Sequence, residues 1–194
     1  DPVRFIGNNS SGKQGFACAR AARDRGADVT LIAANTSLDD IPGVRMIAVE
    51  TAEQMLEALT IEFPRTDLLV MSAAVADARA KTVSASKIKK DRYDAIELVE
   101  NADLLQSMAP LKKSQVIIAF AAETSHDVLA AKAKMHSKGA DILYLNDVSG
   151  GDIFNSENTH GEIFLVDSDS LKVSDTSKDT LAHQLLDQAL LKLG

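Results

Sequence analysis

Apolar runs of strand length alternate with stretches of helical periodicity along nearly the whole chain. This alternation is typical of a parallel β-sheet with helices on both faces. Expected strands lie at residues 3–7, 28–34, 44–49, 67–74, 115–122 and 141–146, and expected helices at 14–25, 51–63, 102–108, 126–138 and 178–193. The strands at 67–74 and 115–122 are expected to be central. The pattern therefore predicts an α/β fold with a Rossmann-like, doubly wound and mostly parallel sheet.

Local signals mark the ends of two of these helices. Gly26 follows the helix at 14–25 and is suited to end it. Thr51 stands where it can cap the next helix, and Gln54 three residues later completes a capping box.

Two stretches depart from this alternation. Residues 78–100 are polar and rich in Lys and Asp, with one strand-like piece at 96–99, and we interpret them as an irregular functional flap. Residues 161–166 and 171–174 flank an Asp/Ser-rich turn, which predicts a C-terminal β-hairpin at about 161–174. Such a hairpin extends a sheet edge or forms a dimer contact. We expect one domain over residues 1–194, because this length matches a single α/β domain.

Composition narrows the function classes. The formal net charge is −7, so nucleic acid and anionic membrane surfaces are not expected partners, and any phosphate must meet a local cluster of positive charge. Cys18 is the only cysteine, which excludes an internal disulfide and suggests a reducing compartment. No apolar run approaches the length of a membrane span, so we expect a cytoplasmic protein. The four histidines lack metal-ligand spacing, and no G-x-S-x-G or G-x-G-x-x-G motif occurs.

The loop at residues 7–13 reads Gly-Asn-Asn-Ser-Ser-Gly-Lys and matches the phosphate-loop pattern G-x-x-x-x-G-K. Gln14 follows where that pattern needs Ser or Thr, whose hydroxyl holds Mg²⁺. A strand, a Gly/Ser-rich loop and a helix N-terminus still make an anion site, because backbone N–H groups and the helix dipole converge there. We therefore expect a nucleotide or phosphate, bound differently from a P-loop ATPase. A plain turn with Ser10 or Ser11 as N-cap is the alternative.

Other candidate residues follow the expected strands, since ligands of open α/β sheets collect at the carboxyl ends of strands. Small residues at 73–74 and 121–122 would let a planar ligand approach the backbone, although they equally permit helix packing. Lysines at 87, 89 and 90 concentrate positive charge in the flap, and a solvated loop is the alternative. Lys134 and Lys138 lie at i and i+4, so both project from one helix face.

Several segments together resemble one known family. They are DPVRFIGNNSSGKQG at 1–15, AAVAD at 73–77, KIKK at 87–90, FAAET at 120–124, and Asn146-Asp147 followed by FNS at 154–156. In this order they resemble phosphopantothenate–cysteine ligase (phosphopantothenoylcysteine synthetase), a domain of bacterial bifunctional coenzyme A biosynthesis proteins. The resemblance spans most of the chain.

The resemblance implies a reaction and a set of site residues. It implies joining of 4′-phosphopantothenate to L-cysteine with CTP and Mg²⁺ through an acyl-cytidylate, which yields 4′-phosphopantothenoylcysteine, CMP and pyrophosphate. Asn8 would support the second step and contact substrate, Arg4 would position the phosphorylated substrate, and Lys87 would contact the triphosphate and support turnover. The implied nucleotide-binding residues are Met71, Ser72, Ala73, Asp77, Lys87, Ala102, Asp103, Leu104, Leu105, Phe120, Lys134 and Lys138. The Mg²⁺ ligands stay unassigned.

The resemblance also implies partners. It implies a homodimer, an upstream flavin-dependent decarboxylase domain in the full-length protein, and a flap at 78–100 that closes over the active site. The family pattern begins with a strand and a Gly-rich loop ahead of the DPVR segment, and the chain starts at Asp1 without Met. We therefore expect an N-terminally truncated piece. Two other functions stay open: a P-loop-like NTPase whose Walker-B-like strand ends at Asp147, and a non-catalytic nucleotide-binding or dimerisation module.

Overall fold

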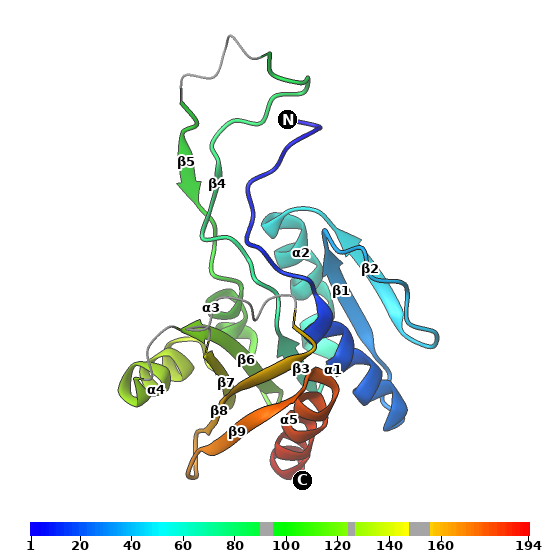
Figure 1. Cartoon of the computed structure of the whole chain (residues 1–194), viewed down its shortest axis with the longest axis vertical. Coiled ribbons are helices and arrows are strands. Elements are labelled where there is room, and N and C mark those ends of the chain that lie inside the picture. Colours follow the sequence, from blue (N-terminus) through cyan, green and yellow to red (C-terminus); the bar gives the residue numbers. More distant parts are fainter. Residues whose placement is uncertain (90–94, 124–126, 148–155) are drawn as a thin grey trace.

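The computed structural model describes residues 1–89, 95–123, 127–147 and 156–194 (Figure 1). The helices are α1 (Lys13–Asp24), α2 (Ala52–Glu62), η1 (Phe63–Arg65), α3 (Leu104–Met108), η3 (Ala109–Leu111), α4 (Val128–Ser137) and α5 (Lys178–Leu193). The strands are β1 (Thr30–Ala34), β2 (Arg45–Val49), β3 (Leu68–Met71), β4 (Ala78–Ala80), β5 (Leu98–Glu100), β6 (Val116–Glu123), β7 (Ile142–Asp147), β8 (Asn158–Leu165) and β9 (Leu171–Ser177). No helix within these ranges is long and apolar enough to cross a membrane.

The main sheet has five strands in the order β3-β6-β7-β8-β9. Strands β3, β6 and β7 pair in parallel, whereas β8 and β9 are antiparallel. The centre of this sheet is fully buried, since Ile117, Ile118 and Ile142 have no exposed surface. Short parallel strands that are apolar on both faces need helices on both faces, which confirms the α/β expectation.

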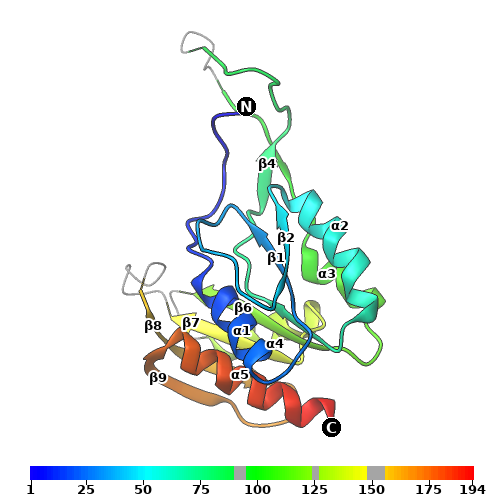
Figure 2. The same cartoon turned by 90° about the vertical axis from the view of Figure 1, so that its right-hand side faces the viewer.

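Two helical layers cover the strands (Figure 2). Helices α1 and α5 lie on one face, where α5 packs on alternate residues of β6, β7 and β8. Helices α2, α3 and α4 cover the other face around Phe63, Met108 and Leu143. The capping box of α2 is present, since Thr51 accepts from the Gln54 N–H and the Gln54 side chain accepts from the Thr51 N–H.

Strands β1 and β2 form a separate two-stranded parallel sheet, although they share the layers of the main sheet. Helix α1 packs on Leu31 and Ala33 of β1 and on Leu68 and Val70 of β3. A cavity of ≈ 2470 Å³ is lined by every residue of β1 and β3. These strands are only half-buried along their length. The two sheets are thus parts of one layer that is interrupted between β1 and β3.

Three expectations need correction. Residues 3–7 form no strand, because none of the described strands pairs with this apolar run. Val3, Phe5 and Ile6 are 61%, 77% and 52% exposed. β3 lies at one edge of the five-stranded sheet and is not central. The flap contains a second strand, β4, which pairs antiparallel with β5. The hairpin expectation is confirmed: β8 and β9 extend the sheet, and β9 forms its other edge.

Glu62 joins the end of α2 to the two-stranded sheet. Its side chain is 10% exposed and accepts from Arg65 at 2.6 and 3.0 Å and from Arg45 of β2. Hydrogen bonds from Arg65, and then from Arg45, lower the pKa of Glu62 from 4.5 to about 2.

We expect the Glu62→Gln variant to be less stable than the parent protein near neutral pH and to match it near pH 2. The unfolded carboxyl binds a proton at higher pH than the folded one. Its stabilisation is therefore complete above about pH 4.5 and is lost as the pH falls to about 2. Urea midpoints measured across this range check the prediction, with Glu57→Gln on the exposed side of α2 as the control. A pH-independent difference between Glu62→Gln and the parent would contradict it.

Candidate functional site

Two loops meet at the carboxyl edge of the sheet. The loop before α1 carries Asn8, whose Nδ2 donates to the carbonyl of Val75 at 3.2 Å in the segment after β3. Ser72, in the same segment, lies against the first turn of α1, since a Cβ added to Gly15 would come 2.8 Å from the Ser72 Oγ. Gly15 therefore permits close approach of the helix to this strand end.

The N-terminus of α1 is open to an anion. Gly12 is the N-cap residue, with φ 73°, and has no side chain to cap the helix. The alternative considered from the sequence, with Ser10 or Ser11 as N-cap, is therefore wrong. First-turn N–H groups without a capping side chain favour a bound negative charge.

Lys13 and Gln14, which decide between a P-loop and another site, both contact protein groups. Lys13 forms an ion pair with Glu157, and the Gln14 Nε2 donates to the carbonyl of Lys178 at 3.1 Å. Burial, and then the nearby charge of Lys13, lower the pKa of Lys178, whose ammonium donates to the carbonyl of Ser156. The arrangement joins the start of α1 to the start of α5.

The expected nucleotide residues fall on both faces of the sheet. Met71 packs with α2 and α3, on the same side as Leu104 and Leu105. Phe120 packs on the opposite face, between α1 and α5. Its ring meets Tyr144 edge-on, with centroids 5.8 Å apart and an interplanar angle of 69°. One flat ligand on one face therefore cannot contact all of these side chains.

The residues at the start of α3 divide into buried and accessible groups. Leu104 and Leu105 are 3% and 4% exposed, so a ligand at this turn would meet mainly backbone. Asp103 caps α3 by accepting from the Gln106 N–H at 3.1 Å and also lies 3.5 Å from the ammonium of Lys138. Lys134 stands one turn before Lys138 on α4. The lysine spacing noted in the sequence thus places one ammonium beside the start of α3.

Arg4 and the Lys87 region share a different place, the arm that β4 and β5 begin (Figure 1). Arg4 forms an ion pair with Asp1 and donates to the carbonyl of Ile88 at 3.0 Å. The arm projects away from both sheets, and the N-terminus lies beside its outer part. Within one chain, the structure does not bring Arg4 and Lys87 together with Phe120.

Asn101 is a structural contributor that the sequence did not reveal. Its Nδ2 donates to the carbonyl of Ala76 at 2.8 Å, and its N–H donates to the carbonyl of Asp77 at 2.8 Å. These bonds fix the base of the arm to the segment after β3. A single Asn between two loops carries no motif, so sequence alone had no signal for it.

Few side chains near the carboxyl edge of the sheet could bind a metal ion. Within the described ranges, no group of three His, Cys, Asp or Glu residues lies close enough to hold a metal ion. Asp77 offers one exposed carboxylate two residues after Val75, whose carbonyl accepts from Asn8. Mg²⁺ is commonly held by one or two carboxylates plus substrate phosphates, so these residues fit Mg²⁺ that arrives with a triphosphate.

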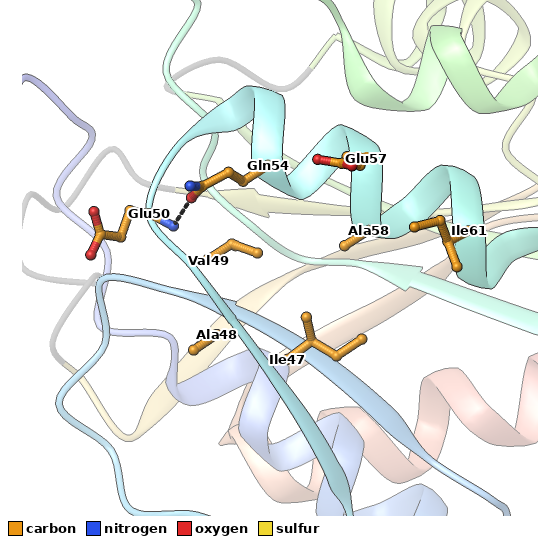
Figure 3. A pocket seen from close by; sticks show the side chains of 8 residues that line it. All are labelled: Ile47, Ala48, Val49, Glu50, Gln54, Glu57, Ala58 and Ile61. Carbon is orange, nitrogen blue, oxygen red and sulfur yellow. Dashed lines mark hydrogen bonds between the residues drawn. The ribbon is translucent and has the colours of Figure 1, made fainter. Parts of the chain in front are cut away.

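A separate groove of ≈ 460 Å³ lies between β2 and α2 (Figure 3). Ile47, Val49 and Ile61 contribute its apolar lining, and Gln54 reaches the Glu50 N–H at 2.7 Å. It contains none of the expected site residues. We therefore place the candidate site at the carboxyl edge of the sheet.

Comparison with known proteins gives a consistent result. The family model described as the DNA/pantothenate metabolism flavoprotein C-terminal domain matches residues 1–192. The coenzyme A biosynthesis bifunctional protein CoaBC of Mycobacterium tuberculosis (strain ATCC 25618 / H37Rv) is 42% identical over 200 residues, covering 96% of this chain and 48% of that protein. Its counterpart in Escherichia coli (strain K12) is 38% identical over 198 residues, covering 99% and 48%. The chain thus spans about half the length of these curated relatives.

Solved structures show the same fold. A crystal structure of the C-terminal domain of a coenzyme A biosynthesis bifunctional protein CoaBC matches with a TM-score of 0.84 and 32% identity, covering 100% of this chain and 88% of that one. The DNA/pantothenate metabolism flavoprotein from Streptococcus pneumoniae matches with a TM-score of 0.80 over 98% of this chain and 93% of its own. Its identity of 16% supports the fold alone.

Proposed function

Because the chain belongs to the family of the DNA/pantothenate metabolism flavoprotein C-terminal domain, we propose that it is a CTP-dependent phosphopantothenate–cysteine ligase of coenzyme A biosynthesis. The observation that carries this proposal is the placement of Asn8. Its carboxamide is held at the meeting of two loops at the carboxyl edge, where open α/β sheets bind ligands.

The first step activates a carboxylate, which is a poor electrophile. An oxygen of the 4′-phosphopantothenate carboxylate attacks the α-phosphorus of CTP, pyrophosphate leaves, and an acyl-cytidylate forms. This step gathers negative charge, and Mg²⁺ carried by the triphosphate would neutralise part of it. The open N-terminus of α1 and the lysines at 87, 134 and 138 are the groups of this chain suited to the remaining charge.

The second step forms the amide. The cysteine amine attacks the acyl carbon, CMP leaves, and negative charge develops on the carbonyl oxygen. A carboxamide has two N–H donors, and the Asn8 Nδ2 uses one of them on Val75. The other is available to stabilise this oxygen without adding a formal charge.

A P-loop-like NTPase is less well supported. Lys13, which in a P-loop would reach the phosphates, is paired with Glu157. Gln14 stands where a P-loop has the Ser or Thr that holds Mg²⁺, and its Nε2 donates to the carbonyl of Lys178.

We also propose that the protein works as a homodimer and that the arm contributes the contact. Val83, Ile96 and Leu98 of the arm are 73%, 54% and 52% exposed, and Phe5 beside it is 77% exposed. A two-stranded ribbon with exposed apolar side chains is marginal by itself, so a second copy would stabilise it. Lys87 on the arm, and Arg4, which contacts the arm at Ile88, would then approach a site by way of the dimer.

The test is a substrate-dependence assay on this chain preceded by the segment that comes before the corresponding position in the Escherichia coli relative. We expect pyrophosphate release from CTP only when 4′-phosphopantothenate is present, and CMP release only after L-cysteine is added. Equal use of ATP, or basal ATP hydrolysis that Lys13→Ala abolishes, would favour the P-loop alternative. CTP binding without turnover would favour the non-catalytic module. A monomeric mass by light scattering in the same samples would remove the dimer from the proposal.

A further inference from the structure

A short series of hydrogen-bonded polar side chains joins β7 to β8. The Tyr144 hydroxyl lies 2.8 Å from the Thr159 hydroxyl, and the latter lies 3.0 Å from the Asn146 Oδ1. Tyr144 and Thr159 are 1% and 3% exposed. Burying a polar group costs free energy unless the group is hydrogen-bonded. These hydrogen bonds therefore stabilise one arrangement of the buried Tyr144 and Thr159 side chains.

The local backbone is shaped to admit the threonine. A register shift between Thr159 and Gly161 interrupts the pairing of β8 with β9. A Cβ added to Gly161 would lie 2.1 Å from the Leu145 carbonyl oxygen and 3.1 Å from the Tyr144 hydroxyl. Glycine therefore lets β8 approach β7 closely enough for the threonine hydroxyl to reach both partners.

The direction of these hydrogen bonds follows from the number of protons that each group can donate. A carboxamide oxygen only accepts, so Thr159 must spend its single proton on the Asn146 Oδ1. The Tyr144 hydroxyl must then donate to Thr159. Burial raises the pKa of Tyr144 to about 12, so its hydroxyl keeps that proton. The Asn146 amide is thereby held in one orientation, with its NH₂ group as the remaining pair of donors.

The position of this NH₂ group suits an anion. Asn146 lies at the carboxyl end of β7, on the same face as Tyr144 and therefore on the side of α1 and α5. Ser72 follows β3, which lies two strands from β7 in the sheet, and both Ser72 and the uncapped start of α1 lie on this side of the sheet. Among the described residues, the hydrogen bond that the structure gives the Asn146 side chain is the one that its Oδ1 accepts from Thr159.

We propose that Thr159 is a positioning residue, which together with Tyr144 fixes the Asn146 amide so that its NH₂ group donates to a phosphate oxygen of a substrate. The inference rests on the proposed function for the identity of that substrate. Two sources share this chemistry: the triphosphate of the nucleotide and the monophosphate of 4′-phosphopantothenate.

The test compares three threonine variants in the same extended chain that is used for the substrate-dependence assay. Thr159→Val has the same shape but cannot donate, and Thr159→Ser restores the hydroxyl. Thr176→Val changes the residue opposite Thr159 in β9 and is the matched control. We expect Thr159→Val to raise one KM by roughly ten- to a hundred-fold, as for loss of a hydrogen bond to a charged group. The two other variants should stay within about two-fold of the parent.

The two substrates distinguish the sources. A rise confined to the KM for CTP assigns the contact to the triphosphate, and a rise confined to the KM for 4′-phosphopantothenate assigns it to the monophosphate. Calorimetric titration with tripolyphosphate and with inorganic phosphate gives the same distinction without turnover, so it decides even if the proposed reaction fails. Unchanged KM values and affinities in folded Thr159→Val would overturn the proposal.

A second variant covers the case in which Thr159→Val does not fold. Asn146→Asp keeps the oxygen that accepts from Thr159 but replaces the NH₂ group with an anionic oxygen, which repels phosphate. We expect it to fold and to lose affinity for the same phosphate probe. Parent-like affinity in Asn146→Asp would overturn the proposal independently.

Discussion

Replacing Asn8 by aspartate is expected to preserve acyl-cytidylate formation and to block its conversion into product. The substitution keeps the shape of the side chain but removes the N–H donors and adds a negative charge. Developing charge on the carbonyl oxygen of the second step would then meet repulsion. Loss of one such donor typically costs about 10²–10³ in rate, and we expect at least that loss for the second step.

A matched control is available one residue further along the chain. Asn9→Asp makes the same change of charge in the same loop at an exposed position to which no role is assigned. Single-turnover experiments with labelled CTP should show the intermediate accumulating in Asn8→Asp but not in Asn9→Asp. If Asn8→Asp accumulates no intermediate, or if both variants fail alike, the role of Asn8 is wrong.

Filling the gap between β1 and β3 is expected to give the largest gain in stability. Among the strands that the structure describes, β1 and β3 each have one edge without a hydrogen-bonded partner, and both line the same cavity. A parallel strand placed there would complete one continuous sheet. It would bury several apolar side chains at about 1.5–3 kcal/mol each, against an ordering cost of about 1–2 kcal/mol per residue.

The net gain from such a strand is estimated at about 3 kcal/mol, which raises the Tm of a domain of this size by about 10 °C. The comparison is between residues 1–194 alone and the same chain preceded by the segment that comes before the corresponding position in the Escherichia coli relative. An extension interrupted by two prolines is the control, because proline cannot donate to either neighbour. Hydrogen exchange should slow at β1 and β3 only with the intact extension. Equal Tm values for the intact and interrupted extensions would contradict the prediction.

Local sequence signals predicted the helices well. The capping box at Thr51 and Gln54 is made by residues three apart, and α5 occupies the residues that its apolar spacing indicated. These features depend on contacts within a few residues, so the sequence contains nearly all the information they need. The buried strand β6 was also recognisable, since a long apolar run needs cover on both faces.

Pairing partners were harder to predict. Residues 3–7 have the composition of a strand but pair with none of the described strands. β4 has a weak strand signal in its sequence and forms because β5 lies beside it. Strand formation depends on a partner distant in the chain, and composition does not identify that partner. For the same reason the sequence wrongly predicted a central position for β3, which lies at an edge of the sheet.

By itself, the sequence determined the α/β class, the helices, the capping box of α2, the C-terminal hairpin and the loops that meet at the carboxyl edge. Only the tertiary structure decided which residues distant in the sequence lie close together in space. It separated Arg4 from Phe120, paired Lys13 with Glu157, and joined Tyr144, Thr159 and Asn146 in one directed chain of hydrogen bonds. The physical reason is that helix periodicity and capping act over a few residues, whereas sheet order and buried polar contacts join residues far apart in the chain.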